Sequence, residues 1–308
     1  MSGAPIRYRL GLNQPAHSPT AQRLAQMAQA IERDTQGSFC LAVCPESTLG
    51  PDPQMFADLQ AGTLEFYLSG ATLGGVAPTS ALALLPYAFS SSEAVFAALD
   101  GGLGTLIRRE LSMAGMHTFR YWFQNGFHHI TTAGRAIEGA ADFAGLKIRS
   151  PGGAIAADFF RALGAEAGMV PFSQMYEALK ERQFDGQSDP HQVALALRLY
   201  EVQTHLSLTG HWWSGFTLLA NAAAWAWLPA DIQWVVERNV EAAAKRQRAD
   251  IEQVNAAGEA ALAAHGMTIA RPDTAGIRAR LGLLYARWRT KFPAATWRTL
   301  ESYADGLG

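Results

Sequence analysis

The chain has 308 residues, of which 49% are hydrophobic and 17% charged, a composition that predicts a globular protein with one large or two smaller domains. Its formal net charge of −2 excludes the excess of Lys and Arg that nucleic acids or anionic membrane surfaces require. The most apolar stretch, residues 217–229, is shorter than the roughly 20 residues that span a membrane, and it contains Asn221.

Strands and helices are expected to alternate through the first quarter of the chain. Pro19 follows Ser18 at the start of the first helix, and Gly37 and Gly62 stand where the first two helices end. This order predicts βαβ units and a mainly parallel sheet. The expected strands are residues 5–13, 38–45 and 63–70, and the expected helices are 18–37 and 52–62.

The alternation continues, with one exceptional segment near the end. Residues 228–266 contain no proline after Pro229 and no glycine before Gly258, and they are rich in good helix formers. No sustained heptad pattern is visible, so a helix of this length is expected to lie along more than one domain. Before it, we expect helices at 92–99, 104–115 and 154–164 and strands at 116–126 and 145–150.

Cys40 and Cys44 are the two cysteines of the sequence. Residues four apart in a strand are separated by about 13 Å, whereas a disulfide needs Cα atoms closer than about 7 Å. We therefore expect two free cysteines and, without a histidine close by in the sequence, no metal site.

The beginning of the chain, MSGAPIRYRL, carries no signal peptide. Met-Ser-Gly stands directly before a strand pattern, as expected where a signal peptide has been removed. The lack of a signal peptide in this sequence is therefore only weak evidence for a cytoplasmic location.

The stretch GLKIRSPGGAIAADFFRALGA, residues 145–165, draws attention to Arg149. A short alternating strand ends near Arg149, and a Pro-Gly-Gly turn and an apolar helix follow. Arg149 is either an ordinary charge on a surface strand or a group in the crevice at the carboxyl end of a strand, where open α/β sheets bind their ligands.

Motifs of known enzyme classes are missing from the sequence. It contains no G-x-S-x-G elbow, no Walker phosphate loop, no H-E-x-x-H and no dinucleotide-binding glycine pattern after a strand. We expect a protein that is not an enzyme and that needs neither a cofactor nor a metal. An enzyme acting on an organic acid is the alternative.

Several motifs in one order carry a family resemblance from about residue 5 to about residue 300. They closely resemble the solute-binding proteins of TRAP transporters, of the DctP type. The motifs are CPESTLGPDPQMFADLQAGTLEF (44–66), NGFHHIT (125–131), residues 145–165, VPFSQMYEALKERQFDGQSDP (170–190) and YEVQTHLSLTGH (200–211).

The resemblance implies an α/β fold with two periplasmic binding protein-like lobes and a ligand cleft between them. Lobe I would comprise residues 1–125 and 215–250, and lobe II residues 126–214 and 251–308. The long helix would span both lobes, and a hinge would close them on the ligand.

The resemblance also implies a periplasmic monomer that captures an organic acid and delivers it to the membrane subunits of a TRAP transporter. The same lobes would equally serve a sensor that presents its ligand to a membrane receptor, and the sequence does not separate these functions.

In this family the arginine at the position of Arg149 holds the ligand carboxylate. A guanidinium suits this role because its planar fork can pair with a carboxylate through two hydrogen bonds. Two neighbouring positions differ from the family pattern, which usually has arginine where this chain has His128 and asparagine where it has Asp189.

Asp189 would repel a ligand carboxylate if it faced one directly, because an ionised aspartate only accepts hydrogen bonds. It would pair with Arg149 or His128, accept from a ligand hydroxyl or amine, or point away and satisfy the turn before Pro190. Beside Asp189, His128 would be held charged and would replace the lost arginine; otherwise it is an ordinary hydrogen-bonded histidine.

Aromatic residues at family cleft positions suggest an aromatic, 2-oxo or hydroxy acid as ligand. Phe172 falls where relatives pack on the ligand, and Trp212 and Trp213 fall where relatives place specificity groups, although burial in the core is the commoner fate of tryptophan. Gly70 replaces the acidic residue of relatives that bind sialic acid, which argues against that ligand. Asn13 and Asp52 also fall near family cleft positions.

Overall fold

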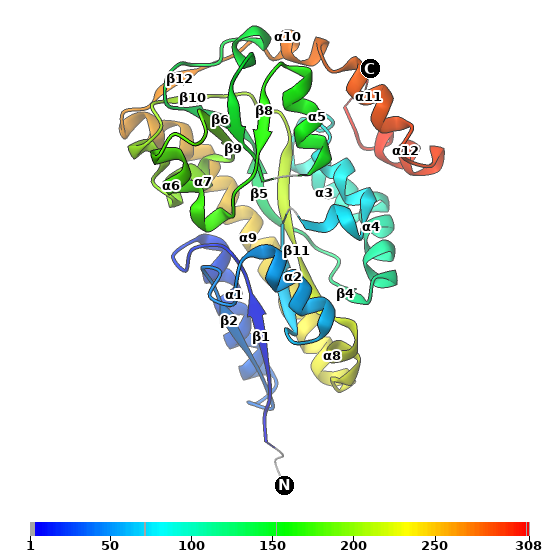
Figure 1. Cartoon of the computed structure of the whole chain (residues 1–308). Coiled ribbons are helices and arrows are strands. Elements are labelled where there is room, and N and C mark those ends of the chain that lie inside the picture. The colour runs from blue at the N-terminus through cyan, green and yellow to red at the C-terminus, as the bar shows by residue number, and fades with distance from the viewer. Residues whose placement is uncertain (1–3, 71, 152, 306, 308) are drawn as a thin grey trace. The chain divides into compact units, whose positions relative to one another are not determined.

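The computed structural model describes residues 4–70, 72–151, 153–305 and 307, so that Gly152 of the Pro-Gly-Gly turn lies outside it. The chain forms two compact units (Figure 1). Unit 1 comprises Met1–Pro78, Ile107–Gln124 and Gly215–Glu252, and unit 2 comprises Thr79–Leu106, Asn125–Ser214 and Gln253–Gly308. Each unit contains a mixed sheet and several helices, which confirms the expected α/β class.

Unit 1 is built on a sheet with the strand order β2-β1-β3-β11-β4, and β5 pairs with β11 beside this path. Its hydrophobic core includes Leu10, Leu24, Phe39 and Phe66, all fully buried. The elements in unit 1 are β1 (Ile6–Gly11), α1 (Pro19–Asp34), β2 (Phe39–Cys44), α2 (Asp52–Ala61), β3 (Phe66–Ser69), the 3₁₀ helix Thr72–Gly75, β4 (Met116–Thr118) and α8 (Ala222–Trp227).

The first helix begins and ends as the sequence predicts. The Ser18 side chain accepts a 3.2 Å hydrogen bond from the Ala21 amide, and Pro19 follows in the first turn, where its missing amide hydrogen costs nothing. The buried face of α1 packs against β2. At the end of α2, Gly62 has a φ of 76°, the left-handed conformation that favours glycine.

The sheets are mixed rather than mainly parallel, which corrects the expectation from the βαβ pattern. β1 runs parallel to β2 and β3, but β11 runs antiparallel to β3 and β4. The reason is that β11 (Trp213–Asn221) enters the unit 1 sheet directly from unit 2 and not through a crossover helix of the kind that keeps neighbouring strands parallel.

Residues 116–126 form two short strands instead of the single expected strand. β4 ends at Thr118, and β5 (Phe123–Phe127) begins five residues later. Within β5, the side chain of Gln247 on α9 accepts from the Gln124 amide at 2.8 Å and donates to the Gln124 carbonyl at 2.7 Å. A buried glutamine thus takes hydrogen bonds that a neighbouring strand would otherwise make.

Unit 2 is built on a second sheet with the strand order β12-β10-β6-β9-β7-β8. β7 lies between β8 and β9 and is parallel to both, whereas β6 is antiparallel to β9 and β10. The elements in unit 2 are α3 (Ser92–Asp100), β6 (His129–Thr132), the 3₁₀ helix Ala140–Phe143, β7 (Lys147–Arg149), α5 (Ala154–Ala162), β8 (Glu166–Gly168), the 3₁₀ helix Phe172–Gln174, α6 (Met175–Lys180), β9 (Gly186–Asp189), α7 (His191–Ala196), the 3₁₀ helix Leu199–Glu201, β10 (His205–Ser207), β12 (Thr268–Ala270), α10 (Thr274–Ala279), α11 (Gly282–Arg289) and α12 (Ala294–Glu301).

Residues 79–106, which the sequence-based division put in lobe I, are grouped with unit 2. The Tyr87 amide donates to the His211 carbonyl at 2.8 Å, and the ring of Phe96 packs edge-on against Trp213 at 5.5 Å. These contacts join the segment to unit 2 although it lies between two stretches of unit 1 in the chain.

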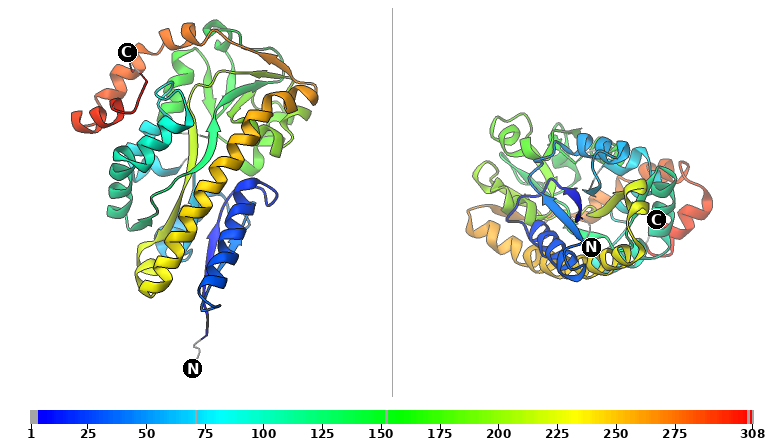
Figure 2. Two further views of the ribbon diagram at one scale, coloured as in Figure 1. Left: turned by 180° about the vertical axis from the view of Figure 1, so that it is seen from behind. Right: turned by 90° about the horizontal axis from the view of Figure 1, so that it is seen from below.

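The long segment near the end of the chain forms the 35-residue helix α9 (Ala230–Ala264), which confirms the expected helix at 228–266 (Figure 2). Residues 230–252 belong to unit 1 and residues 253–264 to unit 2. The first part contributes Val236 and Val240 to the core of unit 1, and the last part contributes Leu262 to a core cluster of unit 2. The 3₁₀ helix Pro78–Leu84, α4 (Gly102–Met113), β5 and β11 also continue from one unit into the other.

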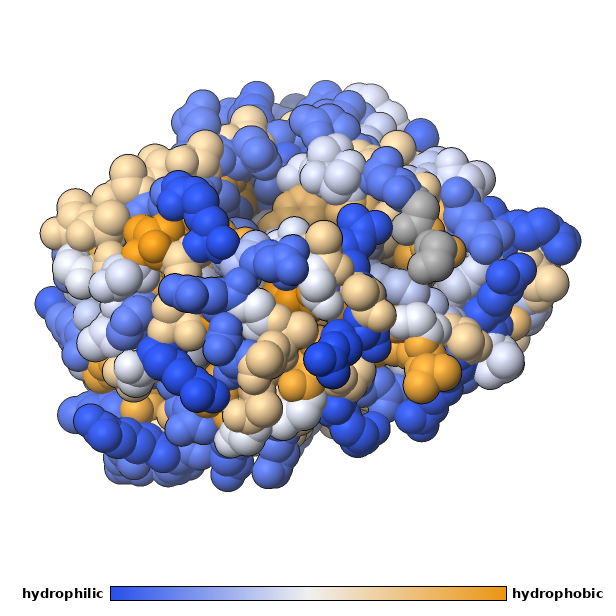
Figure 3. Space-filling model, turned by 90° about the horizontal axis from the view of Figure 1, so that it is seen from above, coloured by the Kyte–Doolittle hydropathy of each residue, from blue (hydrophilic) through white to orange (hydrophobic). Residues whose placement is uncertain are grey.

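Hydrophilic side chains predominate on the face shown in Figure 3, with small separate groups of hydrophobic side chains among them. In the described part of the chain, no helix is both long and apolar enough to cross a membrane.

Cys40 and Cys44 are half-buried and free, without a disulfide. On β2, Cys40 is in register with Arg7 of β1, and Cys44 with Gly11.

Candidate functional site

Arg149 is the last residue of β7, in register with Gly168 of β8 and Gln187 of β9. Its side chain is only 3% exposed, so it is not an ordinary charge on a surface strand. Gly153, four residues later, has a φ of 93° just before α5 begins, a backbone conformation that explains a glycine in the turn.

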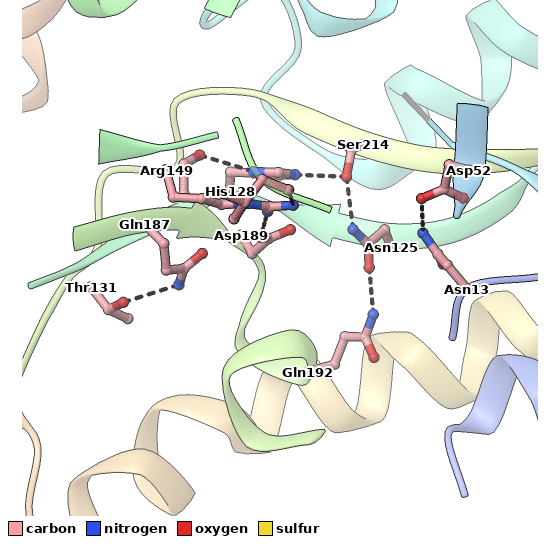
Figure 4. Close-up of polar contacts among 12 residues, drawn as sticks. Asn13, Asp52, Asn125, His128, Thr131, Arg149, Gln187, Asp189, Gln192 and Ser214 are labelled. Carbon is pink, nitrogen blue, oxygen red and sulfur yellow. Dashed lines mark hydrogen bonds and ion pairs between the residues drawn. The ribbon is translucent and has the colours of Figure 1, made fainter. Parts of the chain in front are cut away.

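The guanidinium of Arg149 forms a buried ion pair with Asp189 (Figure 4). Its Nη1 group donates to Oδ2 of Asp189 at 2.8 Å, and its Nη2 group donates to the Val170 carbonyl at 3.3 Å. Asp189 is the last residue of β9, so the pair lies at the carboxyl ends of two adjacent parallel strands. Ligands of α/β sheets bind at such ends.

The ion pair supports one of the alternatives left open for Asp189, whereas a contact of Asp189 with a ligand hydroxyl or amine stays a prediction. Asp189 pairs with Arg149, and its side chain does not cap α7, which begins after Pro190 without a side-chain cap. Burial raises the pKa of the Asp189 carboxyl to about 6, against the opposing effect of Arg149. Desolvation therefore outweighs the attraction of the guanidinium.

His128 is neutral and bonded to serines, which corrects the hypothesis of a charged His128–Asp189 pair. The ring is fully buried, and this burial lowers its pKa to about 3. Nδ1 lies 3.0 Å from the Ser188 hydroxyl and Nε2 lies 2.7 Å from the Ser214 hydroxyl. The nearby Arg149 charge lowers the pKa further, so His128 does not replace the missing arginine as a positive charge.

The two serines extend the contacts of His128 into a buried chain of hydrogen bonds in unit 2 (Figure 4). On one side, Ser188 Oγ lies 2.9 Å from His211 Nε2, and His211 Nδ1 lies 2.7 Å from Thr209 Oγ1. On the other side, Asn125 Nδ2 donates to Ser214 Oγ at 2.9 Å, and Gln192 Nε2 donates to Asn125 Oδ1.

The direction of this chain follows from Asn125. Because its amide donates to Ser214, the Ser214 hydroxyl is left to donate to Nε2 of His128. Nδ1–H of His128 then donates to Ser188, whose hydroxyl donates to Nε2 of His211. In this arrangement each hydroxyl and ring N–H of the chain donates one hydrogen bond, and both histidines are neutral. Burial lowers the pKa of His211, which agrees with its neutral form.

The sequence-based site missed Ser188, His211, Ser214 and Asn125. A signal was present, since Asn125 stands in NGFHHIT, Ser188 in FDGQSDP and His211 in LTGH. The motifs contain three of these residues, but only the fold shows that all four belong to one hydrogen-bond chain through His128.

Trp212 and Trp213 lie in aromatic packing within unit 2 and are almost completely buried. Trp212 packs edge-on against Phe159 at 5.2 Å, and Trp213 against Phe96 at 5.5 Å. Neither indole N–H has a hydrogen-bond partner among the described residues. Phe172 is half-buried and packs against the core cluster around Met175 and Leu179. A ligand contact of these three residues stays a prediction.

Asn13 and Asp52 form a polar cluster in unit 1. Asn13 Nδ2 donates to Asp52 Oδ2 at 2.8 Å, and the Tyr67 hydroxyl donates to Asp52 Oδ1 at 2.6 Å (Figure 4 shows the first contact). Gln14 Nε2 donates to Asn13 Oδ1 at 3.0 Å. The two predicted residues are therefore brought together, and Gln14 and Tyr67 join them.

Gly70 follows β3, where a side chain would collide with an aromatic ring. A Cβ at this position would lie 3.1 Å from the Phe216 ring. Packing alone thus explains the glycine. Within the described ranges, no group of three or more His, Cys, Asp or Glu side chains could hold a metal ion.

Comparison with known proteins identifies relatives of the whole fold. The model of the family "Bacterial extracellular solute-binding protein, family 7", DctP, matches residues 10–291. A solute-binding protein of Verminephrobacter eiseniae is 27% identical over 98% of this chain and 90% of its own length. An uncharacterized protein of Sinorhizobium fredii is 31% identical over 73% of this chain, but the match spans only 42% of that longer protein.

The solved structure of the sugar acid binding protein DctPAm from Advenella mimigardefordensis, in complex with galactonate, has the same fold. The two chains are 26% identical and superpose with a TM-score of 0.92, covering 97% of this chain and 98% of the other. The family match over most of the chain, together with this likeness of fold, settles the classification. The chain belongs to the DctP family of bacterial extracellular solute-binding proteins.

Proposed function

We propose that this protein captures an organic acid through the carboxylate of the ligand, which binds to the guanidinium of Arg149. The observation that carries the proposal is a buried arginine at the carboxyl end of β7, in a chain of the family 7 solute-binding proteins. A guanidinium in such a position can offer a planar pair of N–H donors away from bulk water, where charge-assisted hydrogen bonds are strongest.

A hydroxy acid suits the site better than an aromatic acid. The galactonate complex of the Advenella protein makes a sugar acid a reasonable starting point. The two tryptophans that suggested an aromatic ligand already pack against Phe159 and Phe96, which reduces the support for that class. The 2-oxo acids remain within the proposal because they share the carboxylate.

Thermal melting against a panel of acids tests this function. Galactonate, succinate and phenylpyruvate represent the sugar, dicarboxylic and aromatic 2-oxo acids, and a ligand that binds only the native state raises the melting temperature. We expect at least one acid to raise it in the wild type. In Arg149→Lys, which keeps a positive charge beside Asp189 but loses the planar fork, the increase should shrink strongly.

The matched control is Arg280→Ala, which removes an exposed arginine of the same unit. Its melting response should equal that of the wild type. A panel acid that stabilises the wild type and Arg149→Lys equally would contradict the carboxylate role of Arg149.

We further propose that the protein works in the periplasm, closes on its ligand by a hinge and delivers it to the membrane subunits of a TRAP transporter. The family supports this proposal. Crosslinking in cells that contain the bound acid identifies the membrane partner: a permease supports delivery, whereas a receptor kinase would show the sensor function instead. Recovery of the acid unchanged after incubation is expected for a binding protein, and conversion of the acid would show an enzyme.

A further inference from the structure

The charge at the proposed carboxylate site is already balanced before any ligand arrives. Arg149 contributes one positive charge, and ionised Asp189, 2.8 Å away, contributes one negative charge. Both side chains are at least nine-tenths buried, so water screens the pair weakly. A ligand carboxylate at this guanidinium would bring a second negative charge.

Among the described residues, the histidines near Asp189 do not supply a compensating positive charge. Four histidines lie near Asp189 in the fold. His129 on β6 is in register with Asp189, and His128 precedes it. His191 begins α7, and His211 lies shortly before β11. Burial lowers the pKa of all four imidazoles.

Lys147 on β7 and Glu259 on α9 interact with other side chains than those of the ion pair. Lys147 at the opposite end of β7 is exposed and lies over the ring of Phe184, and Glu259 acts on His191. The charge balance around the pair therefore depends on Arg149 and Asp189.

When a ligand carboxylate joins Asp189 at the guanidinium of Arg149, the protonation of the Asp189 carboxyl changes. Two carboxylates that share a buried site cannot both stay ionised cheaply, and the proton affinity of one of them rises strongly. Asp189 is the candidate because its pKa is already raised to about 6 by burial. A further strong increase, well into the alkaline range, keeps it protonated in the complex at neutral pH and somewhat above it.

We propose that Asp189 takes up one proton from solvent when a ligand carboxylate binds to Arg149, so that Asp189 makes ligand capture proton-coupled. The inference rests on the proposed function of Arg149. The ionised ligand and one proton enter together, the guanidinium changes its ionic partner from Asp189 to the ligand, and the neutral Asp189 carboxyl gains an O–H donor that can bond the same ligand. The total charge of the site stays at zero.

Calorimetric titration of the full chain tests this proton uptake directly. Galactonate and phenylpyruvate serve as probes because both stay ionised above pH 6. Each titration is run at pH 7.5 in two buffers of different ionisation enthalpy, which gives the number of protons taken up. We expect close to one proton per ligand for the wild type, and a dissociation constant that rises about 50- to 100-fold between pH 6.5 and 8.5.

Two variants identify the titrating group. Asp189→Asn keeps the shape of the side chain but cannot ionise, so proton uptake should fall to near zero and the dissociation constant should vary by less than about threefold over the same pH range. His128→Gln removes a neighbouring imidazole and should retain the proton uptake. The wild-type measurement stands alone if Asp189→Asn does not fold.

Three results would overturn the inference. Binding of a probe to the wild type without proton uptake means that ionised Asp189 tolerates the ligand. Loss of the uptake in His128→Gln assigns it to the imidazole. Tighter binding of phenylalanine than of phenylpyruvate, without proton uptake, means that a ligand ammonium and not a proton meets Asp189.

A failure of the proposed function looks different from these results. If neither probe and no other acid of the panel binds to the wild type at any pH, the carboxylate role of Arg149 is wrong and the proton coupling falls with it. A probe that binds, depends on Arg149 and moves no proton overturns the coupling alone.

Discussion

Arg149 Nη1 and Asp189 Oδ2 lie 2.8 Å apart at the ends of two adjacent parallel strands, and both side chains are buried. The two side chains form an ion pair in which each is at most 5% exposed. Buried pairs of this kind contribute little net stability as pairs, but removal of one partner leaves the other as an uncompensated charge.

Arg149→Ala should therefore destabilise the fold as well as weaken binding. We expect the free energy of unfolding at pH 7.5 to fall by about 2–4 kcal/mol, because Asp189 loses its ionic partner, and must stay ionised or take up a proton in a buried site, and because the buried packing of the arginine stem is lost. Urea denaturation measures this loss. The double variant Arg149→Ala/Asp189→Asn should recover at least about 1 kcal/mol of it, since the charge is then gone. Equal losses in the single and double variants would show that the two charges are not coupled.

Acid should destabilise the protein through the buried neutral imidazole of His128. Its pKa is lowered to about 3 in the fold, so the unfolded chain, with a histidine pKa near 6.5, takes up the proton first as the pH falls. The stability contributed by this group is present above about pH 6.5 and is lost on acidification, by about 2 kcal/mol at pH 5.

The measurement is urea denaturation between pH 7 and pH 5 of the wild type and His128→Gln. The variant should lose about 2 kcal/mol less over this range. His17→Gln, at an exposed position of unit 1, is the control and should follow the wild type. An identical pH dependence of His128→Gln and the wild type would refute the assignment.

The hydrogen-bond chain through His128 predicts which nitrogen of each ring carries the proton. Both His128 and His211 should be Nδ1–H tautomers, because Nε2 of each ring accepts from a serine hydroxyl. Nitrogen-15 chemical shifts of the two side chains at pH 7.5 measure this. An Nε2–H tautomer at His128 would reverse the direction of the chain, with the Ser214 oxygen accepting from His128 as well as from Asn125.

Ser214→Ala should cost about 1–3 kcal/mol of unfolding free energy. The change leaves Nε2 of His128 and Nδ2 of Asn125 buried without their shared partner, and unpaired buried polar groups are expensive. Ser112→Ala on the exposed face of α4 is the control and should change stability by less than about 0.5 kcal/mol. Thermal and urea unfolding give both values.

Gly186→Ala should disrupt the strand pairing that places Asp189. A Cβ on Gly186 would lie 2.2 Å from the backbone oxygen of Thr131 on β6, and a backbone atom cannot move aside as a flexible side chain does. We expect a loss of more than about 2 kcal/mol and weaker binding of the acid that the panel identifies. Gly134→Ala, at an exposed position with open space around it, is the matched control for unfolding and calorimetry.

The sequence by itself determined the local structure and the family. Ser18 and Pro19 fixed the start of α1, and the absence of helix breakers over 228–266 fixed α9, because capping and helix propensity act between residues close in the chain. The motifs around Arg149 and Asp189 identified the DctP type, and the family match over residues 10–291 confirms it.

Only the tertiary structure decided what the polar residues of these motifs do. Asp189 meets Arg149 across 40 positions of sequence, and His128 meets Ser214 across 86, distances over which no local pattern reports a contact. The side chain that bonds the backbone of Gln124 in β5 comes in the same way from Gln247, 123 positions away. Burial then set the charges: it made His128 neutral and raised the pKa of Asp189, because removal from water penalises an ionised group whatever its neighbours in the sequence are.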